Sequence, residues 1–306
     1  MNLPCVHLPV PRGGMGVFLD WLLAFARLGF LVGLLLGSGC SSDFEPPSLL
    51  SDLRVLALLA EPADLLLGDS LTLRPAVFVP PGDGLARQSF RFCPFTAGTA
   101  SGFRCLDPRC ELEWPAAPDG SLQIAVEAGW LQCLSPLSGA ALSTLPAETT
   151  TLLPTFRYQA LTQAGVSREA VLQVPLFLGA PPSHPRNRNP LIAEVLWDGA
   201  DALAAASFGP VQSPDSVEVR VRVDPASLDA YQGPAGGWQV EEPLVSFYAS
   251  AGRFQFDSAV GTDVTVRWRA EKLDPGVNQA DFYVVVRDLR GGQAVFGPWS
   301  VPLAAG

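Results

Sequence analysis

The chain has 306 residues, with 20 basic and 30 acidic side chains and a formal net charge of −10 at pH 7. Binding to nucleic acid needs clustered Lys and Arg that displace counterions, whereas this chain has a single lysine, Lys272, and no basic run. The composition therefore argues against nucleic acid as a partner, and the acidity is read as a source of solubility. Hydrophobic residues make up 48% and charged residues 16% of the chain, which is ample material for about two domains.

Residues 1–39 have the pattern of a secretory signal peptide. Arg27 precedes the apolar run Leu28–Leu36, and the small residues "GSG" follow it. A basic region, 7–15 apolar residues and small residues before a cut site define such a signal. An uncleaved membrane anchor is the weaker alternative, because a span of about 20 residues would have to include two charged side chains. Met15, the second of the two methionines, is an alternative start of translation.

Cys40 follows this signal in a stretch that resembles a bacterial lipobox, in which small residues precede a cysteine that is acylated and becomes the first residue of the mature protein. Ser38, Gly39 and Cys40 match that pattern, whereas Gly37 stands where the family prefers leucine. The resemblance implies that Cys40 carries a lipid anchor, whose several acyl chains hold stably to a membrane. Ser41 after the cysteine implies the outer membrane by the usual lipoprotein sorting rule.

Residues 40–51, "CSSDFEPPSLLS", are polar and contain two prolines. We predict that they form a tether between the lipidated cysteine and the first folded domain. Extended at roughly 3.3–3.6 Å per residue, such a tether reaches about 40 Å. The folded part is therefore expected to stand off the membrane surface.

Residues 179–190, "GAPPSHPRNRNP", are rich in proline and polar residues and are predicted to be a linker. On each side, short alternating or β-branched runs are divided by Gly, Pro and Asp, at the spacing of an antiparallel β-sandwich. The predicted fold class is therefore all-β, with one sandwich domain over residues 52–178 and a second over residues 191–306.

An internal repeat supports two similar domains. The segment "DSLTLRPAV" begins at Asp69 and "DSVEVRVRV" begins at Asp215, and both alternate so that apolar residues share one sheet face. Each half also ends in a predicted hairpin, with turns at Ala164-Gly165 and Gly291-Gly292. Glycine at such turns supplies the positive φ that tight hairpins need. Matching pieces in the same order favour tandem domains.

The strand segments carry a family resemblance. "LRVLALLAEPADLLLGDSLTL" in the first half, and "LVSFYASAGRFQFD", "VTVRW" and "YVVVRDLRGG" in the second, resemble the uncharacterised Ig-like lipoproteins of myxobacterial-type Gram-negative bacteria. The similarity covers most of residues 52–303 and implies two tandem Ig-like β-sandwiches. Its motifs specify strands and turns and carry no catalytic residues, so the resemblance supplies no activity.

Four cysteines remain in the first domain once Cys5 and Cys40 are set aside: Cys93, Cys105, Cys110 and Cys133. In an oxidising compartment an even number predicts two disulfides. Three connectivities are possible, and we favour Cys93–Cys105 with Cys110–Cys133. The spacings lack the Cys-x₂-Cys pairs of structural zinc sites, so no metal and no other cofactor is predicted.

Side chains for catalysis are scarce. His184 is the only histidine after Cys40 and lies in the predicted linker, where a solvated residue is expected and a His-based triad or metal site is hard to build. Asp198 with Asp201 is a candidate carboxylate pair for glycoside hydrolysis, but "WDGAD" is first an Asp-Gly turn. Glu241 and Glu242 are adjacent, so in a strand they would point to opposite faces. The chain is therefore predicted not to be an enzyme.

Residues 228–243, "LDAYQGPAGGWQVEEP", form a Gly-rich connection that carries Tyr231 and Trp238. Loops at the ends of a sandwich often bind ligands, and exposed aromatic rings stack on sugars or anchor protein partners. The alternative is that Trp238 folds back over an edge of the core. Trp268 and Tyr283 alternate within strands and are predicted to be core.

Two functions follow from these features. The first is a non-enzymatic lipoprotein of the cell envelope whose Ig-like domains bind or scaffold an envelope protein. The alternative is a glycan-binding or glycan-processing accessory lipoprotein that uses loop aromatics and acids. Exposed, coplanar aromatic rings would favour the glycan, whereas an edge strand open to β-augmentation would favour the protein partner.

Overall fold

The computed structural model describes residues 46–127, 129–130, 151–178, 186–202, 204, 208–212, 215–232, 236–271, 273 and 276–304. The predicted signal peptide, Cys40, Cys133 and His184 lie outside the described residues. The described residues form β-strands and short 3-10 helices, which are η1 (Thr99–Ser101), η2 (Pro108–Cys110) and η5 (Pro225–Ser227). No helix among them has the length and apolar character to span a membrane.

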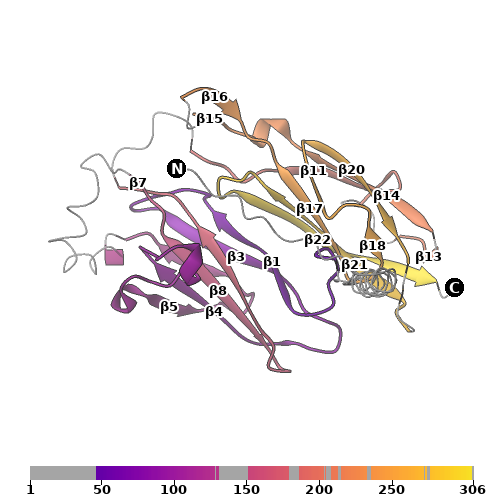
Figure 1. The fold of residues 1–306 in the computed structure, drawn as a ribbon, viewed down its shortest axis with the longest axis horizontal. Helices are drawn as coiled ribbons and strands as arrows, with labels where there is room; N and C mark the ends of the chain where they lie inside the picture. Colours follow the sequence, from indigo (N-terminus) through magenta and orange to yellow (C-terminus); the bar gives the residue numbers. More distant parts are fainter. Residues whose placement is uncertain are drawn as a thin grey trace, which may run out of the picture. The chain divides into compact units, whose positions relative to one another are not determined.

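Lobe 1, defined as the described residues of 52–178, is an antiparallel β-sandwich (Figure 1). One sheet has the order β1-β3-β6 and the facing sheet β5-β4-β8-β9, while β2, β10 and β7 form a short third sheet. Its strands are β1 (Arg54–Glu61), β2 (Leu65–Leu66), β3 (Ser70–Phe78), β4 (Leu85–Cys93), β5 (Leu112–Pro115), β6 (Leu122–Ala125), β7 (Thr151–Leu152), β8 (Thr155–Thr162), β9 (Ser167–Gln173) and β10 (Leu176–Phe177). Both main sheets contribute to one core, with Leu71 and Leu73 of β3 packed in the same cluster as Phe90 and Tyr158.

Lobe 2, defined as the described residues of 191–304, repeats this plan with two five-stranded sheets. Their orders are β12-β11-β14-β20-β18 and β13-β22-β21-β17-β19, and β15 and β16 form a separate ribbon. The strands are β11 (Ile192–Trp197), β12 (Ala200–Asp201), β13 (Val211–Gln212), β14 (Ser216–Val223), β15 (Ala230–Gln232), β16 (Trp238–Val240), β17 (Leu244–Ala249), β18 (Arg253–Phe254), β19 (Ser258–Val260), β20 (Asp263–Arg269), β21 (Gln279–Arg287) and β22 (Gln293–Ala304). Trp268, at 0% exposure, lies within its core as predicted.

The predicted repeat corresponds to equivalent strands. Each Asp-Ser motif opens a strand, β3 in lobe 1 and β14 in lobe 2, and the alternate residues Val217, Val219, Val221 and Val223 of β14 are buried. The predicted hairpins are β8–β9 and β21–β22, both antiparallel. The all-β, sandwich fold predicted from the sequence is therefore confirmed. Whether each lobe folds alone remains a prediction.

The segment before β1 is packed, which corrects the expected length of the tether. Leu49 forms a parallel bridge with Ala249, the Leu50 N–H donates to the Ala249 carbonyl at 2.8 Å, and the Ala249 N–H donates to the carbonyl of Ser48 at 2.9 Å. Leu50 is only 2% exposed. The compact unit therefore begins at Pro46, and the part of the predicted tether that precedes it is residues 41–45.

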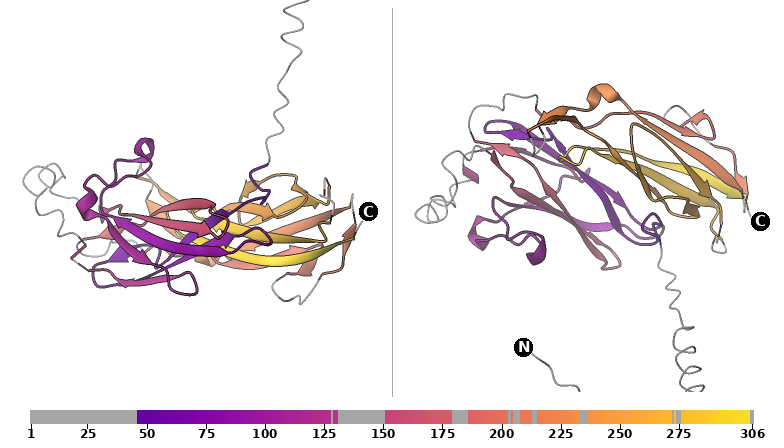
Figure 2. Two further views of the ribbon diagram at one scale, coloured as in Figure 1. Left: turned by 90° about the horizontal axis from the view of Figure 1, so that it is seen from below. Right: turned by 45° about the horizontal axis from the view of Figure 1, so that its top comes forward.

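A third apolar cluster joins the two lobes. Phe78 of β3 packs edge-on against Tyr283 of β21, with ring centroids 6.3 Å apart. Strand β21 is covered on both faces, because Phe282 belongs to the core of lobe 2 while Tyr283 and Val285 belong to this shared cluster. The cluster consists of Leu50, Leu56, Ala57, Phe78, Tyr283 and Val285. Figure 2 shows lobe 1, in indigo to magenta, beside lobe 2, in orange to yellow.

Substitution of Gly252 provides a test of the packing around Trp268. Its φ is +71°, and an added Cβ would lie 2.5 Å from the Arg269 carbonyl oxygen and 2.5 Å from Cζ2 of Trp268. We predict that Gly252→Ala lowers the free energy of unfolding by about 2–4 kcal/mol, from backbone strain and overpacking together. Gly165→Ala is the control, since Gly165 has φ +84° but meets nothing within 4 Å, so strain alone should cost about 1–2 kcal/mol. Equal losses in urea titrations of the two variants would contradict the predicted clash.

Candidate functional site

The β15–β16 hairpin presents two different faces. Its register pairs Ala230 with Val240, Tyr231 with Gln239 and Gln232 with Trp238. Directly paired residues share a face and successive residues alternate, so Trp238 and Val240 lie on one face of the ribbon. Trp238 is 67% exposed and Val240 is 63% exposed. The structure therefore favours an exposed Trp238 over the alternative in which it covers the core.

The opposite face of the hairpin is partly covered, because Tyr231 is half-buried there. The Tyr231 hydroxyl donates to Oε1 of Gln239 at 3.1 Å, and the Arg290 guanidinium lies 4.7 Å from the centre of the Tyr231 ring. A cation over an aromatic face is attracted by the ring's quadrupole. Tyr231 therefore orients the ribbon, and the two predicted aromatics do not lie together on one exposed surface.

Two buried carboxylates close the base of the hairpin. The Asp229 N–H donates to Oε2 of Glu241 at 2.8 Å, and the Glu241 N–H donates to the carbonyl of Asp229 at 3.2 Å. Oε1 of Glu241 accepts a hydrogen bond from Arg290 at 2.7 Å. Both acids are 3% exposed, and burial of such groups is tolerable only when they are paired and hydrogen-bonded. The neighbouring Glu242 is exposed, so these adjacent acids do not form a catalytic pair.

Asp229 is in turn held by the end of the predicted linker. The Arg188 side chain donates to Oδ1 of Asp229 from Nη2 at 2.7 Å and from Nε at 3.1 Å, and the Arg188 N–H donates to Oδ2 at 3.0 Å. This hydrogen bonding raises the pKa of Arg188. The hairpin is thereby attached through the Asp229 carboxylate to a segment far from it in sequence.

Residues 186–189, the RNRN segment, contact both lobes. Nε of Arg186 donates to Oδ1 of Asp64 in lobe 1 at 2.7 Å, and its Nη2 donates to Oδ2 of Asp69 at 2.8 Å. Asn187 reaches both sides, because its N–H donates to Oδ2 of Asp64 at 2.8 Å and its Nδ2 donates to Oδ2 of Asp288 in lobe 2 at 3.0 Å. The polar residues that indicated a linker thus form contacts between the lobes.

Asn189 completes this arrangement. Its Nδ2 donates to the Ala60 carbonyl of lobe 1 at 2.8 Å, and its Oδ1 accepts from the Gln293 N–H of lobe 2 at 2.9 Å. Asp288 also accepts from the Arg290 N–H at 2.7 Å, which fixes the turn between β21 and β22. The same turn thus holds Arg290 under the hairpin and Asp288 against the RNRN segment.

Burial dominates the electrostatics of this cluster. Desolvation raises the pKa of Glu241 and of Asp288 above their ordinary values, and the proximity of Asp288 raises the pKa of Glu241 further. Hydrogen bonds from Arg290 act in the opposite direction on both carboxyls. Within the described residues, no three His, Cys, Asp or Glu side chains gather in a way that would hold a metal ion. The cluster is a structural network that fixes the hairpin.

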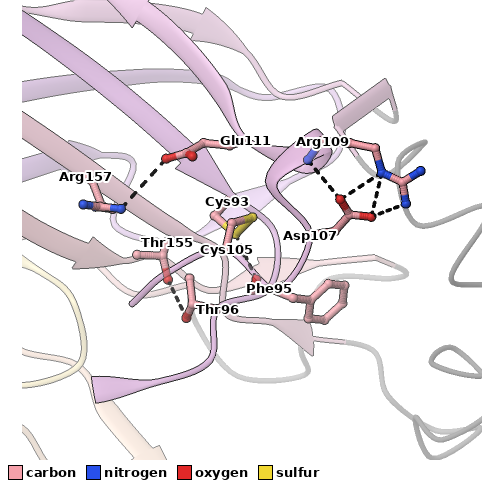
Figure 3. The surroundings of a disulfide bond; sticks show 9 residues. All are labelled: Cys93, Phe95, Thr96, Cys105, Asp107, Arg109, Glu111, Thr155 and Arg157. Carbon is pink, nitrogen blue, oxygen red and sulfur yellow. Dashed lines mark hydrogen bonds and ion pairs between the residues drawn. A yellow bond between two sulfur atoms is a disulfide. The ribbon is translucent and has the colours of Figure 1, made fainter. Parts of the chain in front are cut away.

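The predicted cysteine pairing is confirmed in part. Cys93 and Cys105 form a disulfide (Figure 3), with their Cα atoms 5.6 Å apart. Just after Cys105, the Asp107 carboxylate pairs with Arg109 at 2.6 Å, and this hydrogen bonding lowers the pKa of Asp107 to about 2. Cys110 is also disulfide-bonded. Its predicted partner, Cys133, lies outside the described residues.

Of the remaining candidate acids, Asp198 lies in a tight turn and Asp201 lies in β12, opposite Leu196 of β11. Asp198 and Gly199 have φ of +50° and +81° between the paired residues Trp197 and Ala200. Positive φ at both central residues is the geometry of a two-residue hairpin turn, as the "WDGAD" motif predicted. The positive φ of Asp198 is therefore explained by the turn and needs no catalytic role.

No family model and no curated protein matches the chain. Among solved structures, the D00-D0 domain of intimin has 11% identity over 83% of this chain and 99% of that chain, with a TM-score of 0.23. Fibronectin(III)-like modules of CbhA from Clostridium thermocellum have 9% identity over 82% of this chain and 92% of that chain, with a TM-score of 0.23. Murine CEACAM1b has 8% identity over 83% of this chain and 99% of that chain, with a TM-score of 0.22.

At these identities and TM-scores, the likenesses carry no argument about activity or partners. The observed sheets establish the fold class by themselves: the described residues form two β-sandwiches in tandem, whose strands pair mainly antiparallel.

The contribution of the RNRN segment to stability can be measured at Asp64. Its pair with Arg186 is 2.7 Å long, and the Asp64 side chain is 3% exposed. We predict that Asp64→Ala lowers the free energy of unfolding by about 2–3 kcal/mol, because it leaves the buried Asn187 N–H without its acceptor and removes one of the two carboxylates that pair with Arg186. The control is Asp52→Ala, whose pair with Arg168 is 2.6 Å long but has side chains 57% and 46% exposed. The free energy of unfolding of that variant should fall by less than about 1 kcal/mol. If chemical denaturation gives the same loss of unfolding free energy for both variants, the buried pair stabilises the protein no more than the exposed one.

Proposed function

We propose that this chain is a non-enzymatic lipoprotein of the bacterial cell envelope, of the Ig-like myxobacterial type that its sequence resembles. Acylated Cys40 anchors it to the outer membrane, and the exposed face of the β15–β16 hairpin binds an envelope protein. The observation that carries the binding proposal is Trp238, 67% exposed on a ribbon whose base is closed by buried carboxylates.

A fixed, exposed tryptophan is the kind of residue that dominates protein interfaces. Binding energy at interfaces concentrates in a few aromatic and Arg residues, and a surface that is already ordered loses less entropy on association. Val240 extends the apolar face beside Trp238. The hairpin therefore offers a small apolar anchor site on an ordered support.

The form of the hairpin favours a protein over a glycan. Ribbon β15–β16 is two-stranded among the described residues, so each strand has an edge to which an extended segment of a partner can add by β-augmentation. A sugar platform built from the two predicted aromatics is disfavoured, because Tyr231 lies on the other face under Arg290. The glycan-binding or glycan-processing alternative would rest on Trp238 alone.

The first prediction concerns the anchor. Labelling of growing cells with an alkyne fatty acid should tag the wild-type protein and the Cys5→Ser variant, and Cys40→Ser should lose the tag. Cys5→Ser is the matched control, since Cys5 lies in the predicted signal peptide. A tag that survives Cys40→Ser would refute acylation at Cys40.

The second prediction concerns the hairpin. Trp238→Ala should weaken binding of the cognate envelope protein about 30-fold, as expected for loss of an anchoring aromatic worth about 2 kcal/mol. Leu106→Ala is the control, because Leu106 is 64% exposed in lobe 1. Quantitative cross-linking in intact cells, followed by affinity measurement with the purified partner, gives the readout. Trp238-dependent binding to protein-free cell-wall glycan would instead establish the alternative function.

A further inference from the structure

Pro46, the first residue of the compact unit, lines a groove in lobe 2. This groove has a volume of about 350 Å³ and is lined by Pro46 and by residues 253–258. Phe256 in its wall is 58% exposed. In Figure 1 the first described residues, in indigo, lie beside β18.

The distance from this groove to the proposed anchor is bounded by the chain itself. Cys40 precedes Pro46 by six residues, which span at most about 20–22 Å when fully extended. The shortened tether therefore keeps Pro46 within that distance of an acylated Cys40. If the acyl chains lie in a membrane, the groove residues stay close to its surface.

A group of arginines adjoins the groove. Arg253 of β18 lies directly opposite Arg269 of β20, and the Gln255 N–H donates to the carbonyl of Arg267 at 2.8 Å. All three arginines are exposed. Like charges placed opposite each other across strands are destabilising, so this arrangement is costly for the isolated protein.

These arginines differ from others on the same sheet. Arg220 and Arg222 of the neighbouring β14 pair with Asp263 and Glu194. Within the described part of the chain, Arg253, Arg267 and Arg269 make no ion pair within 4 Å, although Glu218 lies opposite Arg267 and Asp257 lines the groove. An acidic protein thus carries a local set of unpaired cations beside the first residue of its compact unit.

We propose that this surface, the entry patch of Pro46, Arg253, Phe256, Arg267 and Arg269, rests on an anionic phospholipid leaflet. Phe256 enters the headgroup region, where exposed aromatic and apolar side chains of peripheral proteins bind. The arginines contact lipid phosphates, since clustered cations next to an anchor are attracted by anionic lipids. The inference rests on the proposed acylation of Cys40, which brings the entry patch to the leaflet.

The contact would also orient the hairpin. Strand β17 starts at Leu244, four residues after β16, and ends at Ala249, which bonds to Leu50. Figure 1 shows β16 and β18 at opposite ends of lobe 2. With the entry patch on the leaflet, Trp238 is held at the end of lobe 2 that faces away from it.

The test is photo-cross-linking from position 256. The full-length lipoprotein, with benzoylphenylalanine in place of Phe256, is purified in detergent and reconstituted into vesicles of phosphatidylethanolamine and phosphatidylglycerol. We expect phospholipid adducts at position 256 to exceed, several-fold, those from the same photoreactive residue at Leu106, which is 64% exposed in lobe 1. The yield should fall several-fold in phosphatidylcholine vesicles and in the combined variant Arg253→Gln, Arg267→Gln, Arg269→Gln. Arg253→Gln alone should give a smaller drop if the combined variant does not fold.

The outcomes separate the two proposals. Protein that floats with the vesicles but yields no more lipid adduct at position 256 than at position 106 refutes the entry patch and leaves the anchor intact. Adducts to a second protein chain in place of lipid also refute it. Protein that does not float with the vesicles refutes the lipid anchor, and the entry patch falls with it.

Discussion

The two lobes depend on one short polar segment, residues 186–189, that hydrogen-bonds to both. Arg186 binds Asp64 of lobe 1, Arg188 binds Asp229 of lobe 2, and Asn187 bonds to a carboxylate on each side. Buried carboxylates are costly unless they are paired. Each of these acids therefore stabilises the arrangement of the two lobes in which its Arg or Asn partner lies within hydrogen-bond distance. Apolar packing of Phe78 against Tyr283 supplies the non-directional part of the interface, and the RNRN segment supplies its specific geometry.

This network also determines how the binding face is presented. Asp229 and Glu241 at the base of the hairpin are bound to Arg188 and Arg290. The apolar outer face is therefore carried by a ribbon whose base is held by buried hydrogen bonds and whose other face contacts Arg290 through Tyr231. The Gly-rich connection is thus anchored by Asp229 and Glu241, which lie on either side of its glycines.

The parts of the fold that were predictable from sequence are those set by local pattern. The alternation of apolar and polar residues predicted which valines of β14 are buried. The Asp-Gly and Gly-containing turn motifs predicted the turn at Asp198-Gly199 and the terminal hairpins of the two lobes. The RNRN segment was read as a linker because proline and polar residues look alike whether they are solvated or bound, and Asp64 lies 122 residues before Arg186. One signal was present: "FYVVV" in β21 lacks polar alternation, which indicates a strand covered on both faces and hence a second packing surface beyond the core of lobe 2.

The same reasoning applies to the start of the folded unit. Leu49 and Leu50 stand among prolines and serines, and composition alone assigned them to a tether, yet Leu50 fills part of the cluster between the lobes and its neighbour pairs with Ala249. Two leucines exposed in a tether would lose the burial energy of about 1.5–3 kcal/mol each, so a "SLL" run beside a predicted strand is better read as the first packed segment. Because this segment bonds to the end of β17 and the hairpin precedes its start, one strand connects the point of chain entry with the face that carries Trp238. An anchor near Cys40 and a binding face at the hairpin would thus be linked through ordered structure, with residues 41–45 as the part of the predicted tether left between Cys40 and the folded unit.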